Sequence, residues 1–463
     1  MAAKAAVILA CAPAALCWQL HASPARKLCT AVPLPMRAPL LSASVSDDWI
    51  RDLDLVSFGR DVKALGRRLK SAEGEADLQH LKKMQRLNSA FMVIGIATMS
   101  LPLNPIAVLS LSTWTYASWT MLAHHTCHGG YNMHRVKGMH SRVFALGSPI
   151  NRARDWLDWM LPEAWNHEHN ALHHYKLGEL GDPDLVERNL EFLRDWKGPR
   201  ALKLLFVIVM AGVWKWVYYA PNTFKQMKAS EYQQSHDGKL PKGVDGHTAI
   251  TLGGVLFRPS EFAGLFTRAE FFGRCLLPML AARFLLMPAP LLALPGGLGT
   301  VCYGHAVVNL FVADILSNYH AFLTIVTNHA GDDLYKFSTG CNPNSPTFML
   351  RQVLSSANYR TGGDANDFVH GWLNYQTEHH VWPTLSMLSY QKGQPELEAI
   401  CARYGVPYTQ HSVFVRLVQT VRIMIGDSSM KEWPGHPDED QPPSTSDISL
   451  VETVLPLEVK RPA

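Results

Sequence analysis

WNHEHNALHHYKLGELGDPD, residues Trp165–Asp184, is the stretch on which the interpretation of the whole chain depends. It holds four histidines within eight residues: His167, His169, His173 and His174. On a helix, His169 and His173 would lie one turn apart on the same face, with His174 beside them. Several imidazoles could then converge on one metal ion, and a surface helix has no other evident need for them.

Two further histidine clusters flank this stretch. Upstream, His124 and His128 form an HxxxH pair; downstream, Gln376 precedes His379 and His380 in the pattern QxxHH. A single HxxxH is weak evidence, because zinc sites and chance both produce it. Three clusters at these spacings, separated by paired apolar segments, predict one shared metal site.

Composition excludes several other classes of protein. The 463 residues carry a formal net charge of +4 without a concentrated basic patch, so nucleic acid is not an expected partner. The eight cysteines include no CxxC pair, so neither a thiolate zinc site nor a disulfide framework is expected. Histidine must therefore carry any metal. Imidazole-rich sets suit iron, copper, zinc or nickel, and so many histidines make two ions more economical than one.

The first 86 residues divide into two segments. Residues 1–46 contain no acidic residue and are rich in Ala, Ser, Leu and Pro, which is typical of a plastid transit peptide, alone or behind a secretory signal. The alternative is a secretory signal or a plain membrane anchor, with the endoplasmic reticulum membrane as the location. Residues 47–86 are amphipathic and basic, and they fit either helices on a membrane surface or a helix packed on the core.

Apolar segments predict four membrane-spanning helices in two hairpins. The segment Leu87–Ala123 carries no charged residue and is interrupted at Asn104-Pro105. The second hairpin turns at residues 295–297, Pro-Gly-Gly. The four spans are expected over residues 87–103, 105–123, 275–294 and 298–326.

Residues 201–220 are also apolar but contain Lys203 and Lys215. A lysine near the bilayer centre costs about 2.5–3.5 kcal/mol on insertion scales, so this helix is expected to be interfacial. An even number of crossings then separates each pair of histidine clusters, and all three would lie on one side of the membrane. A crossing by residues 201–220 would place the third cluster opposite the first two.

In type, order and placement, these histidine clusters resemble those of the membrane-bound fatty acyl desaturases, over roughly residues 87–412. The resemblance implies an all-α polytopic membrane protein with four transmembrane helices and a helical cap that carries a di-iron site. It implies insertion of a double bond into a lipid acyl chain, with dioxygen and two electrons. It also implies eight iron ligands, with His320 as the alternative to His329: His124, His128, His169, His173, His174, His329, His379 and His380.

Four more residues are expected to lie around the metals or to bind them weakly: His125, His167, Gln376 and Asp182. Gln376 stands where most of the family has histidine, and it resembles the front-end desaturases, which act between an existing double bond and the carboxyl end. Many of those carry a fused cytochrome b5-like domain with a His-Pro-Gly-Gly motif, and that tetrapeptide does not occur in this sequence. A separate electron donor is therefore expected, either ferredoxin, which suits a plastid leader, or cytochrome b5.

Other interpretations remain open at this point. Asp182 and Asp184 either orient ligand histidines or belong to a helix-ending turn around Pro183. Another di-iron membrane oxygenase, a hydroxylase or ketolase acting on acyl, sphingoid or carotenoid substrates, is the nearest rival, and a histidine-rich metal transporter is a distant one. The expected organisation is a leader (1–46), an amphipathic segment (47–86), a desaturase domain (87–412) and a C-terminal segment (413–463) with a largely disordered tail.

Overall fold

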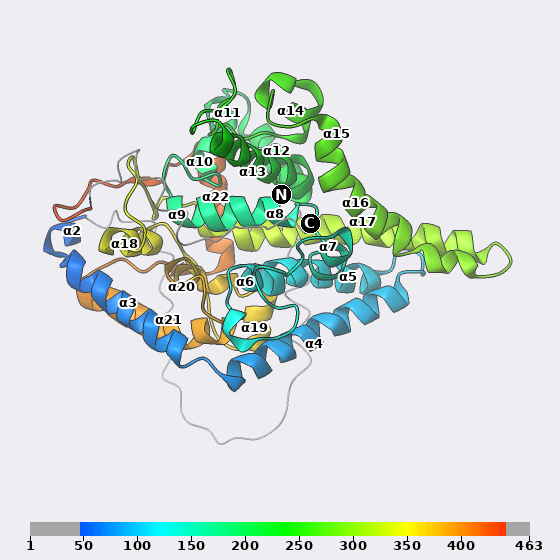
Figure 1. The fold of residues 1–463 in the computed structure, drawn as a ribbon, viewed down its shortest axis with the longest axis horizontal. Helices are drawn as coiled ribbons and strands as arrows, with labels where there is room; N and C mark the ends of the chain where they lie inside the picture. The colour runs from blue at the N-terminus through cyan, green and yellow to red at the C-terminus, as the bar shows by residue number, and fades with distance from the viewer. Residues whose placement is uncertain (1–46, 441–463) are drawn as a thin grey trace.

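The computed structural model describes residues 47–440; the expected leader and residues 441–463 lie outside the described residues (Figure 1). The described chain is mostly helical, as predicted. Its strands are two residues long and form two parallel pairs. Strand β1 (Tyr335–Lys336) pairs with β4 (Lys431–Glu432), and β2 (Asn358–Tyr359) pairs with β3 (Gln410–His411).

The amphipathic segment folds into the core. It forms α2 (Trp49–Asp52) and α3 (Leu55–Ser71), and α3 packs against α18 (Pro346–Leu354) and α21 (Met387–Tyr404). Burial of each large apolar side chain contributes roughly 1.5–3 kcal/mol, so α3 is held firmly. The interpretation as a helix packed on the core is therefore correct for α3, and its placement on a membrane through its apolar face is wrong. The apolar side chains that α3 buries are Leu55, Phe58, Val62, Leu65 and Leu69.

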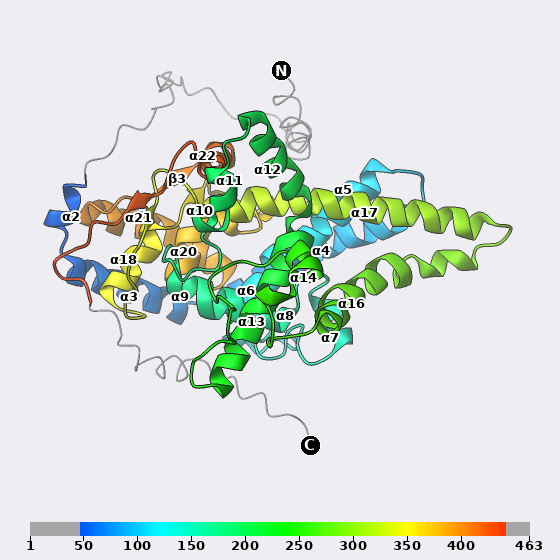
Figure 2. The same cartoon turned by 90° about the horizontal axis from the view of Figure 1, so that it is seen from above.

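The first predicted hairpin is present, with shifted bounds. Helix α4 (Glu75–Thr98) begins twelve residues before the expected span, and α5 (Pro105–Ala117) continues through a π-helix, η1 (Ser118–Ala123), into α6 (His124–Cys127). The break between them falls at Asn104-Pro105, as predicted. There the Asn104 side chain accepts a hydrogen bond from the backbone N–H of Ile106 and so caps α5. Helices α4 and α5 lie side by side (Figures 1 and 2).

The second predicted hairpin protrudes from the rest of the molecule (Figure 2). Its first arm is a broken helix of five pieces, and its second arm is α17 (Leu298–Ile325). Gly296 and Gly297 make the turn at positive φ, 66° and 76°, where glycine avoids the strain that a side chain would bring. The five pieces of the first arm are α15 (Arg268–Phe271), η6 (Phe272–Leu276), α16 (Leu277–Leu280), η7 (Ala281–Leu286) and η8 (Ala289–Ala293).

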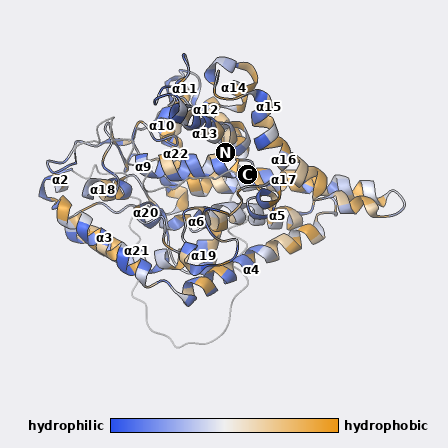
Figure 3. Ribbon diagram, in the orientation of Figure 1, coloured by the Kyte–Doolittle hydropathy of each residue, from blue (hydrophilic) through white to orange (hydrophobic). Residues whose placement is uncertain are grey.

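Both hairpins expose large apolar side chains, and apolar residues are frequent towards their tips (Figure 3). A soluble surface rarely carries so large an apolar area, whereas a bilayer requires it. These exposed side chains include Val93, Leu101, Leu103, Ile106, Leu285, Leu286, Leu292, Leu298 and Val301.

Among the described residues, three helical stretches are long and apolar enough to cross a membrane: 200–235, 268–293 and 298–328. The last two are the predicted second hairpin. The first predicted hairpin does not meet the same criterion, and residues 200–235, expected to be interfacial, do meet it. These residues form one continuous helix: α12 (Arg200–Trp214), η4 (Lys215–Tyr219) and α13 (Ala220–Ser235).

The lysines that argued against this third helix are both buried and paired. Lys203 donates to the backbone carbonyls of Arg194 and Ile425, at 2.8 and 2.9 Å. Lys215 Nζ lies 2.8 Å from Asp158 Oδ2, and neither side chain is exposed. The lysines therefore serve tertiary structure, and their charge alone does not decide where the helix lies relative to a bilayer.

The end of the described chain is more ordered than predicted. Helix α22 (Val413–Ile425) packs against α12, and β4 follows it. The ring of Trp433 then packs against those of Trp49 and Tyr335, with centroids 6.1 and 5.5 Å apart. The C-terminal segment, expected to end in a largely disordered tail, is therefore folded from residue 413 to residue 440.

Candidate metal centre

The histidine-rich stretch is helical, but it is not a regular α-helix. Between α8 (Pro162–Trp165) and α9 (His174–Lys176), residues Asn166–His173 form a π-helix, η3. The backbone N–H of His174 donates to the carbonyl of His169, five residues earlier. Single π-turns inside helices occur often at functional sites. Here the wider turn brings His169 and His174 into one cluster and directs His173 towards another.

The other predicted ligands come from three separate segments. His124 and His128 follow the π-helix η1, and His379 and His380 lie on α20 (Gln376–Val381). His329 follows a short 3-10 turn, η9 (Val326–Asn328), at the end of α17.

The ring nitrogens of all eight predicted ligands come together in two groups, within each of which they lie no more than 4.8 Å apart. In the first group, His124 Nε2 is 3.0 Å from His169 Nε2; in the second, His329 Nε2 is 3.1 Å from His380 Nε2. The groups adjoin, because the rings of His174 and His380 stack at 4.2 Å. The first group is His124, His128, His169, His174 and His379; the second is His173, His329 and His380.

The chemistry of these groups fits metal ions. The Nε2 atoms of His128, His174 and His379 are buried and have no hydrogen-bond partner in the described chain. A buried nitrogen left unpaired costs about 1–3 kcal/mol, which coordination to a cation would offset. Burial also holds the pKa values of these three imidazoles well below the usual range, and that of His329 at about 3. The rings are therefore neutral, as metal ligands must be.

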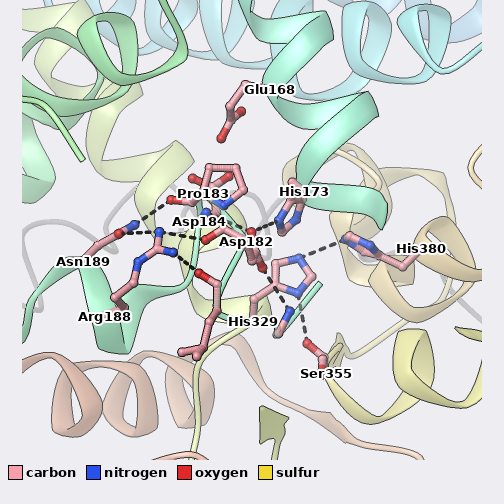
Figure 4. Close-up of polar contacts among 12 residues, drawn as sticks. Glu168, His173, Asp182, Pro183, Asp184, Arg188, Asn189, His329, Ser355 and His380 are labelled. Carbon is pink, nitrogen blue, oxygen red and sulfur yellow. Dashed lines mark hydrogen bonds and ion pairs between the residues drawn. The ribbon is translucent and has the colours of Figure 1, made fainter. Parts of the chain in front are cut away.

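Buried carboxylate and carbonyl groups orient the second group (Figure 4). Asp182 Oδ1 lies 2.9 Å from His173 Nδ1, and the carbonyl of Ser355 accepts from His329 Nδ1 at 3.1 Å. Each contact engages Nδ1, so Nε2 is the ring nitrogen that could bind a metal ion. Burial opposes protonation of His173, but the Asp182 carboxylate outweighs burial and raises the pKa of the ring.

Asp182 also serves the turn that follows. Its carboxylate accepts the backbone N–H groups of Gly178 and Asp184, at 3.0 and 2.9 Å. Asp182 therefore contacts a predicted ligand and also stabilises the turn around Pro183.

The remaining predicted residues lie around the groups or away from them. Gln376 Nε2 is 2.9 Å from His329 Nε2, whereas His125 donates to the carbonyl of Met121 at 2.7 Å. His125 and His167 belong to neither group. The alternative ligand His320 also lies outside both groups.

His320 is occupied by other contacts. Its Nε2 donates to the carbonyl of Val369 at 2.7 Å, and its ring stacks on Tyr116 at 3.6 Å. His305 is likewise paired, with the carbonyl of Ser100 at 3.0 Å, as expected for a histidine within a helical bundle.

Sequence reasoning missed Glu168, which lies between two of the predicted histidine positions. The side chain is fully buried, and burial together with nearby Asp184 and Asp182 raises its pKa well above the usual range. Its Oε2 lies 3.5 Å from the hydroxyl of Tyr219, and Figure 4 places it beside Asp184. Asp184 also forms a possible metal-binding group with His169 and His173. A carboxylate inside the histidine motif itself was the available signal.

Together, the fold and the site define a helical membrane protein with a buried, multi-histidine centre. The chain belongs to the fatty acid desaturase family, whose model matches residues 100–412. It is an oxidoreductase of lipid metabolism, and its centre is compatible with the metal use of that family.

Known relatives are distant but consistent with this family. The chain is 23% identical to the NADPH-dependent stearoyl-CoA 9-desaturase of Mycobacterium tuberculosis, over 81% of this chain and 80% of the relative. It is 29% identical to the acyl-lipid (9-3)-desaturase of Physcomitrium patens, over 25% of this chain and 21% of that one. It is 20% identical to the Delta(5) fatty acid desaturase A of Dictyostelium discoideum, over 53% of this chain and 48% of that one. No solved structure matches.

Proposed function

We propose that this desaturase acts on acyl chains of membrane lipids at two iron ions held by the eight histidines. The observation that carries the proposal is the pair of adjoining imidazole groups, five rings and three, with buried unpaired nitrogens. The histidine-rich, thiolate-free donor set suits iron. Bound iron would supply the oxidising power for removing two hydrogens from an alkyl chain.

The overall reaction has a defined balance. One acyl CH2–CH2 unit, one dioxygen, two electrons and two protons give one CH=CH unit and two waters. The protein's part is to hold and orient the ligands, to keep bulk water out and to position the chain. Asp182 and the carbonyl of Ser355 perform the orienting role for His173 and His329.

Topology supports a four-span arrangement in which α12 does not cross. The three candidate spans all lie between the second and third histidine clusters in the sequence. Because these clusters meet in one site, an even number of crossings must separate them. The broken helix 268–293 and α17 form a natural pair of spans, which leaves 200–235 at the interface. The hairpin of α4 and α5 would then supply the other two spans before the first cluster.

The remaining parts of the proposal rest on composition, charge and the membrane setting. The acid-free leader favours a plastid membrane over the endoplasmic reticulum. The apolar helices favour a lipid-linked acyl chain, which a membrane presents directly, over a soluble carrier. We propose ferredoxin as the separate electron donor, with cytochrome b5 as the alternative. Helix α3 lies at the end of the molecule opposite the second hairpin (Figure 1). It carries the partly exposed Lys63 and the exposed Arg67, so it suits an acidic soluble donor.

The test is expression in a host that lacks the product, followed by fatty-acid profiling with location of the double bond. New unsaturated chains, two hydrogens lighter than their precursors, are expected from the wild type. His379→Ala should abolish them, and His236→Ala, on an exposed loop, should not. Products heavier by one oxygen would instead establish the hydroxylase alternative. Retained activity in His379→Ala would contradict the ligand assignment.

A further inference from the structure

The loop that follows the first histidine cluster is held against α4. It joins α6 to α7 (Pro149–Asp155), and Asn132 and Ser141 close it through two hydrogen bonds of 2.9 Å. Between these two residues Met139 is buried, and its sulfur accepts from Gln85 Nε2 on α4 at 3.5 Å. These contacts fix the positions from which the other side chains of the loop project.

Basic side chains gather on this loop and on the adjoining turns of α4. Three exposed cations come from the loop, and two more come from α4, on either side of Gln85 in the sequence. The two on α4 are four residues apart, so they lie on one face of the helix. None of the five side chains takes part in an ion pair or a hydrogen bond within residues 47–440. These residues, the basic patch, are Lys82, Arg86, Arg135, Lys137 and Arg142.

Two acids next to this loop are paired with other cations. Glu73 lies 3.7 Å from His134 Nε2 but pairs with Lys70 Nζ at 2.8 Å. Asp155, at the end of α7, pairs with Arg154 Nε at 2.6 Å. The basic patch therefore carries a positive charge that these acids do not compensate, and it suits an anionic partner.

The basic patch lies where the first hairpin enters and leaves the membrane. Arg86 is the last charged residue before the uncharged segment 87–123, and the loop begins directly after the hairpin ends. The loop also exposes two apolar side chains beside its cations, since Met133 and Val143 are 60% and 53% exposed. Cations and apolar side chains mixed at the end of a span are typical of segments that lie among lipid headgroups.

The backbone at Arg135 supports a role for its side chain outside the fold. Arg135 has φ 50° and ψ 31°, in the left-handed region that favours glycine. The same loop uses glycine at another such position, Gly138, with φ 81°. An arginine in this conformation costs stability, and such strain is commonly found at binding sites.

We propose that the basic patch binds the headgroups of anionic lipids, while Met133 and Val143 contact the adjoining acyl chains. The inference rests on the four-span arrangement proposed above. It adds a lipid-binding site that is separate from the site of the acyl substrate at the histidines. Because the loop begins directly after His128, a bound lipid also stabilises the connection between the first histidine cluster and the membrane surface.

The test is thermal unfolding of the purified protein in detergent, with added dioleoyl phosphatidylglycerol or dioleoyl phosphatidylcholine. Phosphatidylglycerol should raise the Tm more than phosphatidylcholine does, and about 0.5 M salt should reduce the difference. The double variant Arg135→Gln/Lys137→Gln should bind phosphatidylglycerol about 30-fold more weakly. Each cation near an anionic surface contributes about a factor of five to this affinity.

A second variant excludes an effect of misfolding. Arg135→Gly relieves the left-handed φ, so it should not lower the Tm in detergent alone, yet it should weaken the binding of phosphatidylglycerol about fivefold. The matched control is Lys63→Gln/Arg67→Gln, which removes two cations from α3, at the end of the molecule opposite the second hairpin (Figure 1). The control should bind phosphatidylglycerol as the wild type does.

Three outcomes would overturn the lipid site. One is an equal loss of affinity in the patch and control variants, which would be an effect of overall charge. Another is an equal increase in Tm with sn-glycerol 3-phosphate, which has no acyl chains. The third is a patch variant that loses ferredoxin binding but keeps the effect of phosphatidylglycerol, which would assign the patch to a protein partner. None of these measurements depends on desaturation, so fatty-acid profiling decides the proposed function separately.

Discussion

His329 Nε2 and His380 Nε2 face each other across 3.1 Å, although 51 positions separate them in the sequence. The backbone carbonyl of Ser355 fixes His329 from behind, and His380 belongs to the third histidine cluster. His320, one helical stretch earlier, is instead held by Val369 and Tyr116. The structure thus assigns to the second group a histidine that lies outside every sequence cluster.

His329→Ala should remove one ligand from the three-histidine group and leave the five-histidine group intact. We expect the purified protein to lose about half of its iron and all of its desaturation activity. His320→Ala should keep both, because that ring lies outside the two groups. Iron content per protein and fatty-acid profiles of the expressing host measure the two effects. Equal iron in both variants would contradict the assignment of His329.

Asp182→Asn should weaken metal binding without removing a ligand. The carboxylate of Asp182 orients the His173 ring and raises its pKa. An asparagine side chain has no negative charge, so the His173 ring would be less basic and a weaker metal ligand. Loss of such a partner typically costs 10–100-fold in metal affinity or activity, so we expect a decrease of about that size. Titration with a chelator measures the affinity. Glu191→Gln, an exposed acid on α11 (Glu191–Asp195), is the control and should behave as the wild type.

Charge reversal on α3 should affect electron delivery and nothing else. Lys63 and Arg67 take part in no ion pair within the described chain, and between them Gly66 packs against the indole of Trp382, two residues after His380. The double variant Lys63→Glu/Arg67→Glu should lower the rate with ferredoxin and reduce its dependence on salt. The rate with a chemical reductant should not change.

The control for this prediction is Lys239→Glu/Lys242→Glu, which changes the same charges in a distant exposed loop. It should leave the rate with ferredoxin unaltered. If both double variants lower that rate equally, α3 is not the docking face. Stronger binding of the wild type to anionic vesicles than to ferredoxin would assign the face to a membrane instead.

The loop that carries His329 should become less stable at low pH, because an ion pair that holds it depends on an ionised carboxylate. Arg416, fully buried, donates to Asp333 at 2.6 Å and to the carbonyl of Ala330 at 3.0 Å. Burial would raise the pKa of Asp333, but the contact with His411 and the charge of Arg416 outweigh it and lower the pKa. The pKa of Asp333 is lower in the folded protein than in the unfolded chain, where it is about 4. The ionised carboxylate therefore stabilises the fold at pH values above about 4, and this stabilisation is lost as the pH falls towards the pKa of the folded state.

Thermal unfolding in detergent between pH 7 and pH 3 measures whether the stabilisation by Asp333 decreases as the pH falls. The difference in Tm between the wild type and Asp333→Asn should be largest near pH 7 and shrink as the pH decreases. A difference that grows with acidity would refute the argument. Arg416→Met should be destabilising by roughly 3–5 kcal/mol at neutral pH, because it leaves partners of a buried charge without their donor.

The chain's own sequence determined much of this protein. The histidine spacings, the Asn104-Pro105 break and the glycine turn at 296–297 act locally, so each could be interpreted without knowing what packs against it. The mostly helical fold, the second hairpin and seven of the ligand candidates follow from such local signals. His329 required the resemblance to a family as well.

Only the tertiary structure decided the rest, because those features depend on partners distant in sequence. The charges of Lys203 and Lys215 suggested a helix outside the bilayer, but carbonyls and Asp158 pair them within the fold. The apolar stripe of α3 fits a membrane surface and a protein core equally well, and α18 and α21 select the core. The division of the histidines into groups of five and three depends on a π-turn, in which the backbone N–H of His174 donates to the carbonyl of His169. The spacing of the histidines in the sequence does not distinguish this π-turn from a regular α-helical turn.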